Sequence, residues 1–98
     1  MALFLVQCRD VPEGASLRAQ HRHDHLAHVR GSGQTRLAGG VLGEDDAIVG
    51  SWLVIEAANQ AEAQAWCAAD PFRKAGVYAD VTITPVRMTY TNLKPEGI

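Results

Sequence analysis

Cysteine is scarce in this chain. Its 98 residues include only two, Cys8 and Cys67, which lie far apart and form no CxxC motif. Small secreted proteins usually depend on several disulfides, and the start of the chain, residues 1–6, has neither a charged n-region nor a cleavage site. Each cysteine falls in a predicted strand or helix, where a free thiol behaves as a small apolar side chain. We therefore expect two reduced, structural thiols in a cytoplasmic protein.

Long apolar runs and concentrated positive charge are also lacking. No run approaches the ~20 residues that span a bilayer. The nine Lys and Arg residues are scattered along a chain of net charge −2, whereas nucleic-acid binders carry a basic stripe. The glycines lack the spacing of a P-loop or dinucleotide motif, and no nucleophile elbow is present. These absences argue against membrane and nucleic-acid partners, and nothing in the chain implies a redox cofactor.

The composition that remains is globular, with 47% apolar and 20% charged residues. The length suits one domain, residues 1–98. A domain of this size has a thin core, so pairing with a second copy of the chain would stabilise it.

Apolar patterning and turn residues predict four strands and two helices. The strands are expected at 2–8, 34–42, 47–57 and 77–91, the last punctuated by Pro85, and the helices at 17–30 and 60–69. The order β-α-β-β-α-β indicates an α+β, ferredoxin-like fold, with a four-stranded antiparallel sheet and two helices on one face. The tail, residues 92–98, is expected to be loose or packed on a partner.

Helix boundaries are marked by particular residues. Ser16 is the expected N-cap of the first helix, and Gly31 with Gly33 supplies its stop signal. Asn59 and Glu62 form a capping box at the start of the second helix. Pro71 ends that helix because it disfavours helical geometry in the preceding residue.

The apolar pattern of the strands also predicts what lies on the sheet face opposite the helices. The first and third strands are apolar on successive residues, which is typical of strands buried on both faces. A sheet with two apolar faces cannot leave one in water. We expect a second copy of the chain to cover it as a homodimer.

All four histidines lie in the first helix. At 100° per residue, His25 falls on the same arc as Arg22, Leu26 and Val29, at the border between core and solvent. A histidine there suits general acid or base chemistry near neutral pH. The alternative is a boundary histidine whose ring only fills space, and spacing alone leaves both open.

Two further patterns in the chain allow more than one interpretation. His21, His25 and His28 share an arc that a transition metal could bridge, but no nearby cysteine supports this and we do not expect a metal site. Asp70 precedes Pro71 at the expected end of the second helix, where negative charge is disfavoured. It is either a turn-forming residue or a carboxylate turned inward to orient an imidazole.

Glycines inside strands form the last pattern. Gly39 and Gly40 face Ser51 across the predicted hairpin, and such glycines often mark a bulge or a close approach to a ligand. Ser51 is placed to donate a hydrogen bond to such a ligand. A merely flexible hairpin is the alternative.

Together these motifs resemble the YCII-related (YciI-like) family, in its order and spacing from Ala2 to about Met88. The motifs are Arg22-His23-Asp24-His25-Leu26, Ala38-Gly39-Gly40, Gly50-Ser51, Asp70-Pro71-Phe72 and Ala75-Gly76-Val77-Tyr78. The resemblance implies a dimeric α+β barrel with a small-molecule pocket. It also implies that His25 and Asp70 form a catalytic dyad with Ser51 nearby. Where the family usually has Ala-Gly-Pro, this chain has Gly40, which loosens the pocket edge.

Our leading interpretation is an enzyme of lyase or isomerase type acting on a small molecule. His25 and Asp70 would be catalytic. The residues expected to bind substrate are Arg22, Ser51, Gly39, Gly40 and Phe72. The alternative is a non-catalytic metabolite-binding or stress-response module that uses the same pocket, and a third is a structural accessory domain that docks on another protein.

Overall fold

A computed structural model describes residues 1–93. Its elements follow the predicted order, with two additional short helical turns. The strands are β1 (Ala2–Asp10), β2 (Thr35–Leu42), β3 (Ile48–Ala57) and β4 (Tyr78–Val86), and the helical segments are α1 (Gly14–Gly31), α2 (Gln60–Ala68), α3 (Pro71–Lys74) and the 3₁₀ turn η1 (Glu44–Asp46).

The four strands form one antiparallel sheet in the order β2-β3-β1-β4. Both central strands pair along almost their whole length, from Ala2 opposite Ala57 to Arg9 opposite Gly50. Pro85 lies in the edge strand β4, a position that tolerates its missing amide hydrogen. The α+β, ferredoxin-like prediction is confirmed.

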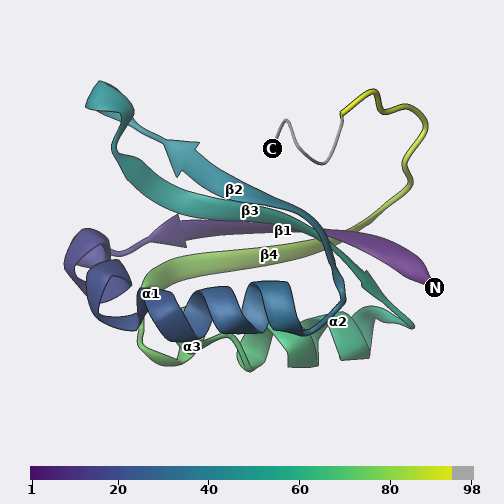
Figure 1. Ribbon diagram of the computed structural model, residues 1–98, viewed down its shortest axis with the longest axis horizontal. Helices are drawn as coiled ribbons and strands as arrows, with labels where there is room; N and C mark the ends of the chain where they lie inside the picture. The colour runs from purple at the N-terminus through teal and green to yellow at the C-terminus, as the bar shows by residue number, and fades with distance from the viewer. Residues whose placement is uncertain (94–98) are drawn as a thin grey trace.

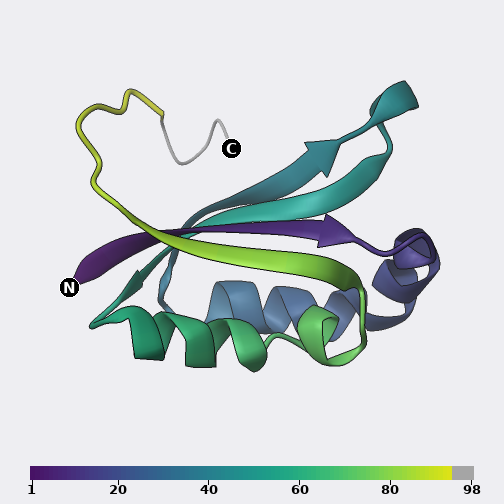
Figure 2. The same cartoon turned by 180° about the vertical axis from the view of Figure 1, so that it is seen from behind.

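Helices α1, α2 and α3 all cover the same face of the sheet (Figures 1 and 2). Side chains alternate between the two faces of a strand, and the central residues of β1 and β3 that point toward the helices are buried. Phe4, Val6, Leu53 and Ile55 are among the core residues of this layer, together with Trp66 of α2. Both cysteines are buried and free, as predicted.

The capping prediction at α2 is confirmed, but the one at α1 is wrong. The Glu62 amide donates to the Asn59 side chain at 2.9 Å. The first helix begins at Gly14 and not after Ser16, and Glu13 is its N-cap without a side-chain hydrogen bond. Gly14 explains the earlier start, because a Cβ there would lie 2.7 Å from the Cβ of Asp10. Glycine lets the first turn pack directly on the end of β1.

The fourth strand is shorter than predicted. It ends at Val86, which pairs with Leu3 near the start of β1. β1 extends only one residue beyond that point, to Ala2. Residues 87–93 leave the sheet as an irregular segment on the side opposite the helices (Figures 1 and 2). Most of the tail expected to be loose or partner-packed, residues 94–98, lies outside the described residues.

The sheet face opposite the helices is partly apolar. Leu3 and Leu5 of β1 and Trp52 and Val54 of β3 project from it and are half-buried. They alternate with the fully buried residues of the helix side.

None of the helices in residues 1–93 is long and apolar enough to cross a membrane.

Candidate functional site

The side chains of His25 and Asp70 meet in the interior, although 45 positions separate them in the sequence. His25 Nδ1 lies 2.7 Å from Asp70 Oδ1, and both residues are buried, at 9% and 3% exposed. Because a carboxylate accepts hydrogen bonds and does not donate them, this contact favours the imidazole tautomer with its hydrogen on Nδ1. The other ring nitrogen, Nε2, is then left with a free lone pair.

Asp70 is positioned by the short helix α3. It is the N-cap of α3, where its Oδ1 also accepts the Phe72 amide hydrogen at 2.9 Å. Pro71 occupies the first position of α3, where a missing amide hydrogen costs nothing. The expected conflict with a helix dipole was therefore wrong, because Asp70 starts a new helix and does not end α2. One carboxylate thus caps α3 and also contacts the imidazole of His25.

Phe72 fixes the plane of the imidazole. Its ring stacks on that of His25 with the centroids 3.8 Å apart and the planes 5° from parallel. The same residue donates its amide hydrogen to Asp70. Phe72 thus contacts both the imidazole of His25 and the carboxylate of Asp70. His25 therefore has little freedom to turn away.

Ser51 lies at the centre of a second polar cluster. Its Oγ accepts hydrogen bonds from Arg18 Nη2 at 2.8 Å and from the Tyr78 hydroxyl at 3.0 Å. A serine oxygen has two lone pairs and one hydrogen. Both acceptor positions are filled by these contacts, and neither of them uses the Ser51 hydrogen.

Burial keeps Tyr78 in the role of a donor. Desolvation is the main cause that raises the pKa of the Tyr78 phenol, and the hydrogen bond to Ser51 opposes it only in part. The phenol therefore keeps its proton across the physiological range. The Tyr78 ring also packs edge-on against that of Phe72, with the ring centroids 6.2 Å apart. This contact joins the Ser51 cluster to the stacked rings of His25 and Phe72.

Arg18 is held by a two-point ion pair. Its Nε and Nη2 donate to the two carboxylate oxygens of Asp10 at 2.7 and 2.9 Å. Burial lowers the pKa of Arg18, but the hydrogen bond and charge of Asp10 outweigh it, so the net shift is upward. The guanidinium carbon also lies 5.1 Å from the centre of the Phe72 ring. Arg18 is thus a fixed cation behind Ser51.

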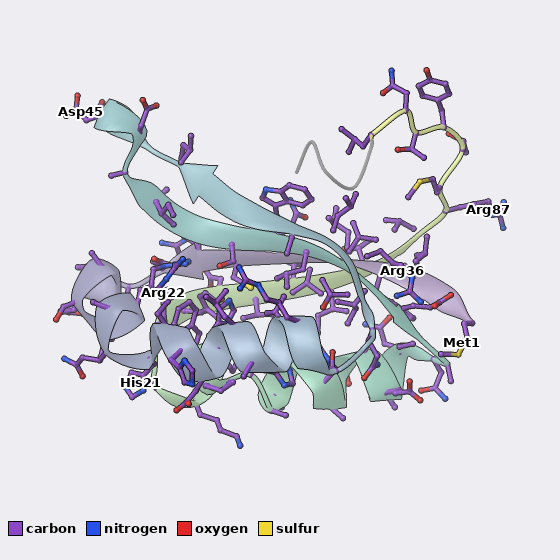
Figure 3. The ribbon with its side chains drawn as sticks, in the orientation of Figure 1. Met1, His21, Arg22, Arg36, Asp45 and Arg87 are labelled. Atoms are coloured by element: carbon purple, nitrogen blue, oxygen red, sulfur yellow. The ribbon has the colours of Figure 1, made fainter. Side chains whose placement is uncertain are left out.

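A cavity of about 550 Å³ opens between α1 and the β2–β3 hairpin. Its walls combine apolar and cationic side chains. Among the residues that line it are Arg18, Arg22, His25, Leu26, Val29, Arg30, Arg36, Ile48, Ser51, Leu53 and Phe72. Figure 3 shows Arg22 directed from α1 toward the sheet, whereas His21 points to the opposite side of the helix.

The structure brings the predicted site residues together. His25, Arg22, Ser51 and Phe72 all line this one cavity, as do Gly39 and Gly40. Asp70 is not among the lining residues and contacts His25 in the interior. Whether these residues bind or convert a substrate stays a prediction.

The two strand glycines make room for neighbouring side chains. A Cβ on Gly39 would lie 2.7 Å from the indole nitrogen of Trp52, and one on Gly40 would lie 3.1 Å from Ile48. Ile48 itself lines the cavity. The close approach expected at these positions therefore involves the protein's own side chains, and Gly40 shapes the cavity through Ile48.

The remaining histidines of α1 have different surroundings. His28 Nε2 lies 2.9 Å from the Trp66 carbonyl oxygen, and its ring packs on that of Trp66. His21 is half-exposed. Within residues 1–93, no group of three or more His, Cys, Asp or Glu side chains is arranged to hold a metal ion.

Sequence reasoning missed three residues of the Ser51 cluster. Arg18 is seven residues before His25 and therefore lies on the same face of the helix. Its place beside His25 could have been predicted from helical periodicity. Tyr78 was named only within a motif of the family resemblance, without a role, and Asp10 had no signal, because only the fold brings the end of β1 and the start of β4 next to α1. Their roles depend on contacts between segments far apart in the sequence.

The sequence profile of the YCII-related domain matches residues 2–87. The chain belongs to this family. A protein of Haemophilus influenzae, known only as uncharacterized, is 30% identical over 96 residues, which cover 89% of this chain and 98% of that protein. Protein YciI of Escherichia coli O6:H1 is 28% identical over 97 residues, covering 90% and 99% of the two chains.

Several solved structures are similar to this YCII-related chain. One is the 5-chloro-2-hydroxyhydroquinone dehydrochlorinase TftG of Burkholderia phenoliruptrix AC1100 in complex with 2,5-dihydroxybenzoquinone. It has a TM-score of 0.77 and 28% identity, and the match covers 91% of this chain and 95% of that one. An antibiotic biosynthesis monooxygenase has a TM-score of 0.57 at 14% identity, covering 92% and 100%. The second likeness concerns the fold alone.

Proposed function

We propose that this YCII-related protein is a small-molecule enzyme of lyase or isomerase type, in which His25 transfers a proton. The observation that carries the proposal is the 2.7 Å contact between Asp70 and Nδ1 of His25, a residue that lines an open cavity. Nε2 accepts a proton from the substrate, and Asp70 stabilises the imidazolium that results. A positioned base of this kind contributes roughly 10²–10⁴-fold to the rate.

Ser51 supplies the complementary donor. Removal of a proton from a carbon next to a carbonyl, or from a hydroxyl group, places negative charge on the substrate oxygen. Ser51, which contacts Arg18, stabilises that charge by its hydrogen bond. Loss of a leaving group from that state gives a lyase. Return of the proton to another atom gives an isomerase. Arg22, Gly39, Gly40 and Phe72 would shape and anchor the substrate.

The relative TftG supports this reaction class. It is a dehydrochlorinase, and its complex holds 2,5-dihydroxybenzoquinone. That ligand is a flat ring with hydroxyl and carbonyl oxygens, which pairs a proton donor with an acceptor as the site of His25 and Ser51 requires. We propose a substrate of comparable size for this chain, without transferring its identity.

We also propose that the protein works as a homodimer through the sheet face that carries Leu3, Leu5, Trp52 and Val54. Burial of this half-buried apolar surface would add the core that a chain of 98 residues lacks. Both thiols are free, which fits the proposed cytoplasmic, reducing environment.

The test is a screen of hydroxylated and chlorinated aromatic compounds and lactones, followed by kinetics of variants. His25→Ala and Asp70→Asn should each lower kcat/KM by about 10²-fold or more on any substrate found. His21→Ala is the matched control, because that ring points away from the cavity (Figure 3). Full activity in His25→Ala and Asp70→Asn would refute the proposal. A ligand that binds at His25 and is never consumed would favour a metabolite-binding module.

A further inference from the structure

Positive charge is concentrated at the cavity although the chain as a whole is slightly acidic. The net charge is −2, yet four of the nine Lys and Arg residues line this one cavity. They are Arg18, Arg22, Arg30 and Arg36. No Asp or Glu of the described part of the chain lines it. The side chains that line the cavity therefore carry positive charge, whereas the net charge of the chain is negative.

Two of these arginines are already neutralised. Arg18 pairs with Asp10, and Arg36 pairs with Glu56. Within residues 1–93, neither Arg22 nor Arg30 forms an ion pair. Both are exposed at the cavity wall. The uncompensated positive charge of the cavity thus resides on these two side chains.

Arg22 and Arg30 lie on either side of His25 along α1. At ~1.5 Å per residue, Arg22 is ~4.5 Å before His25 along the helix axis and Arg30 is ~7.5 Å after it. The wall between His25 and Arg30 is apolar, formed by Leu26 and Val29. The cavity therefore offers a cation at each end, an apolar wall and a proton acceptor between them.

We infer that the ligand of this cavity is an organic dianion with a flat or apolar body, held by its two ends between Arg22 and Arg30. Guanidinium groups bind carboxylates and similar oxyanions through paired, charge-assisted hydrogen bonds. The apolar body lies against Leu26 and Val29, and its reacting atom faces His25. This inference rests on the proposed function and deepens it by naming the class of substrate.

Binding of three benzene derivatives at low salt tests the inference without requiring turnover. Isothermal titration calorimetry compares terephthalate, with two opposite carboxylates, with benzoate, which has one, and with neutral benzamide. Terephthalate is expected to bind about tenfold more tightly than benzoate, the usual worth of one additional charge-assisted contact. Benzamide should bind most weakly, and added salt should weaken terephthalate most.

Arginine variants locate the two ends. Arg22→Gln and Arg30→Gln should each weaken terephthalate binding by about tenfold. Arg87→Gln is the matched control, because it removes the same charge from a side chain that lies outside the cavity and projects from the irregular segment after β4 (Figure 3). Terephthalate that binds no better than benzoate, or unchanged binding in both variants, would overturn the inference.

The Asp70→Asn variant separates this inference from the catalytic proposal. It keeps all four arginines, so terephthalate should bind it as it binds the parent protein. If the dianion binds as expected and no substrate is ever converted, the catalytic proposal fails and the dianion site stands. If a neutral substrate is converted through His25 and terephthalate does not bind, the dianion site fails and the catalytic proposal stands.

Discussion

Asp70 and Phe72 together determine how His25 is presented to the cavity. One oxygen of Asp70 accepts both the Phe72 amide hydrogen, at 2.9 Å, and a contact from His25 Nδ1, at 2.7 Å. The Phe72 ring stacks on the imidazole. The three residues form a closed unit in which a short helix, α3, orients a side chain of α1.

Tyr78→Phe should reduce turnover without unfolding the protein. The variant removes the hydroxyl that donates to Ser51 and leaves the ring that meets Phe72. Without this donor the Ser51 hydroxyl is free to rotate, and its hydrogen points toward the substrate less often. We therefore expect kcat to fall several-fold while KM changes little. Kinetics of Tyr78→Phe on a substrate found by screening provide the measurement. The control is Tyr90→Phe, which alters an exposed residue after β4. An equal fall in both variants would argue against a positioning role for Tyr78.

Asp10→Asn should be strongly destabilising. Asp10 and Arg18 have side chains only 6% and 16% exposed, and loss of one partner leaves the other charge buried without compensation. The free energy of unfolding should fall by about 3 kcal/mol. Asp80→Asn is the control, because Asp80 pairs with Arg9 at an exposed site, where a pair is worth about 1 kcal/mol or less. Urea unfolding at neutral pH measures both, and equal losses would contradict the account.

Stability should decrease above pH 9. Burial raises the pKa of the Cys8 thiol from 9.0 to about 12 and that of Cys67 to about 11. In the unfolded chain both thiols ionise above pH 9, whereas in the folded protein they stay protonated, so rising pH favours unfolding. The contribution is complete below pH 9 and is lost as the pH rises through 11 to 12.

The size of this effect is on the order of 2 kcal/mol per thiol at pH 10.5. Urea unfolding between pH 7 and 10.5 would measure it. Cys67→Ala should show a shallower alkaline decline than the parent protein. Both native thiols should also resist alkylation at pH 8. Rapid alkylation without unfolding would contradict the burial of these groups.

Gly50→Ala should disrupt the pairing of β1 and β3. A Cβ at Gly50 would lie 2.3 Å from the carbonyl oxygen of Cys8, a backbone atom that cannot move aside. We expect a loss of about 2 kcal/mol or more in unfolding free energy. Gly31→Ala is the control, since nothing lies within 4 Å of a Cβ there. Thermal unfolding compares the two, and a neutral Gly50→Ala would contradict the register in which these two strands pair.

Local signals in the sequence predicted the elements well where a residue acts on its neighbours in the chain. Asn59 and Glu62 cap α2, and Gly33, with a φ of 77°, follows the C-cap Ser32 of the first helix. The start of α1 was not predictable, because it depends on the packing of Gly14 against Asp10, a contact made after the chain turns back. The end of β4 likewise depends on its pairing with β1, which begins only one residue before Leu3, the partner of Val86.

In the candidate site, too, local patterns predicted some features and only the fold determines the others. Helical periodicity places His25 beside Arg22 on one arc, but it cannot say which carboxylate reaches the imidazole. Asp70 was selected by resemblance, and only the fold shows that it begins α3 and contacts His25 at the same time. The Asp10–Arg18–Ser51 connection joins three elements and has no local signature.

The protonation of His25 tests the central claim most directly. Nitrogen NMR of the imidazoles at pH 8 distinguishes the two neutral tautomers. The account predicts that His25 carries its hydrogen on Nδ1, with a sharp, slowly exchanging signal that Asp70→Asn abolishes, and that Nε2 is bare. A hydrogen on Nε2, or a ring that averages both tautomers as an exposed histidine does, would contradict it.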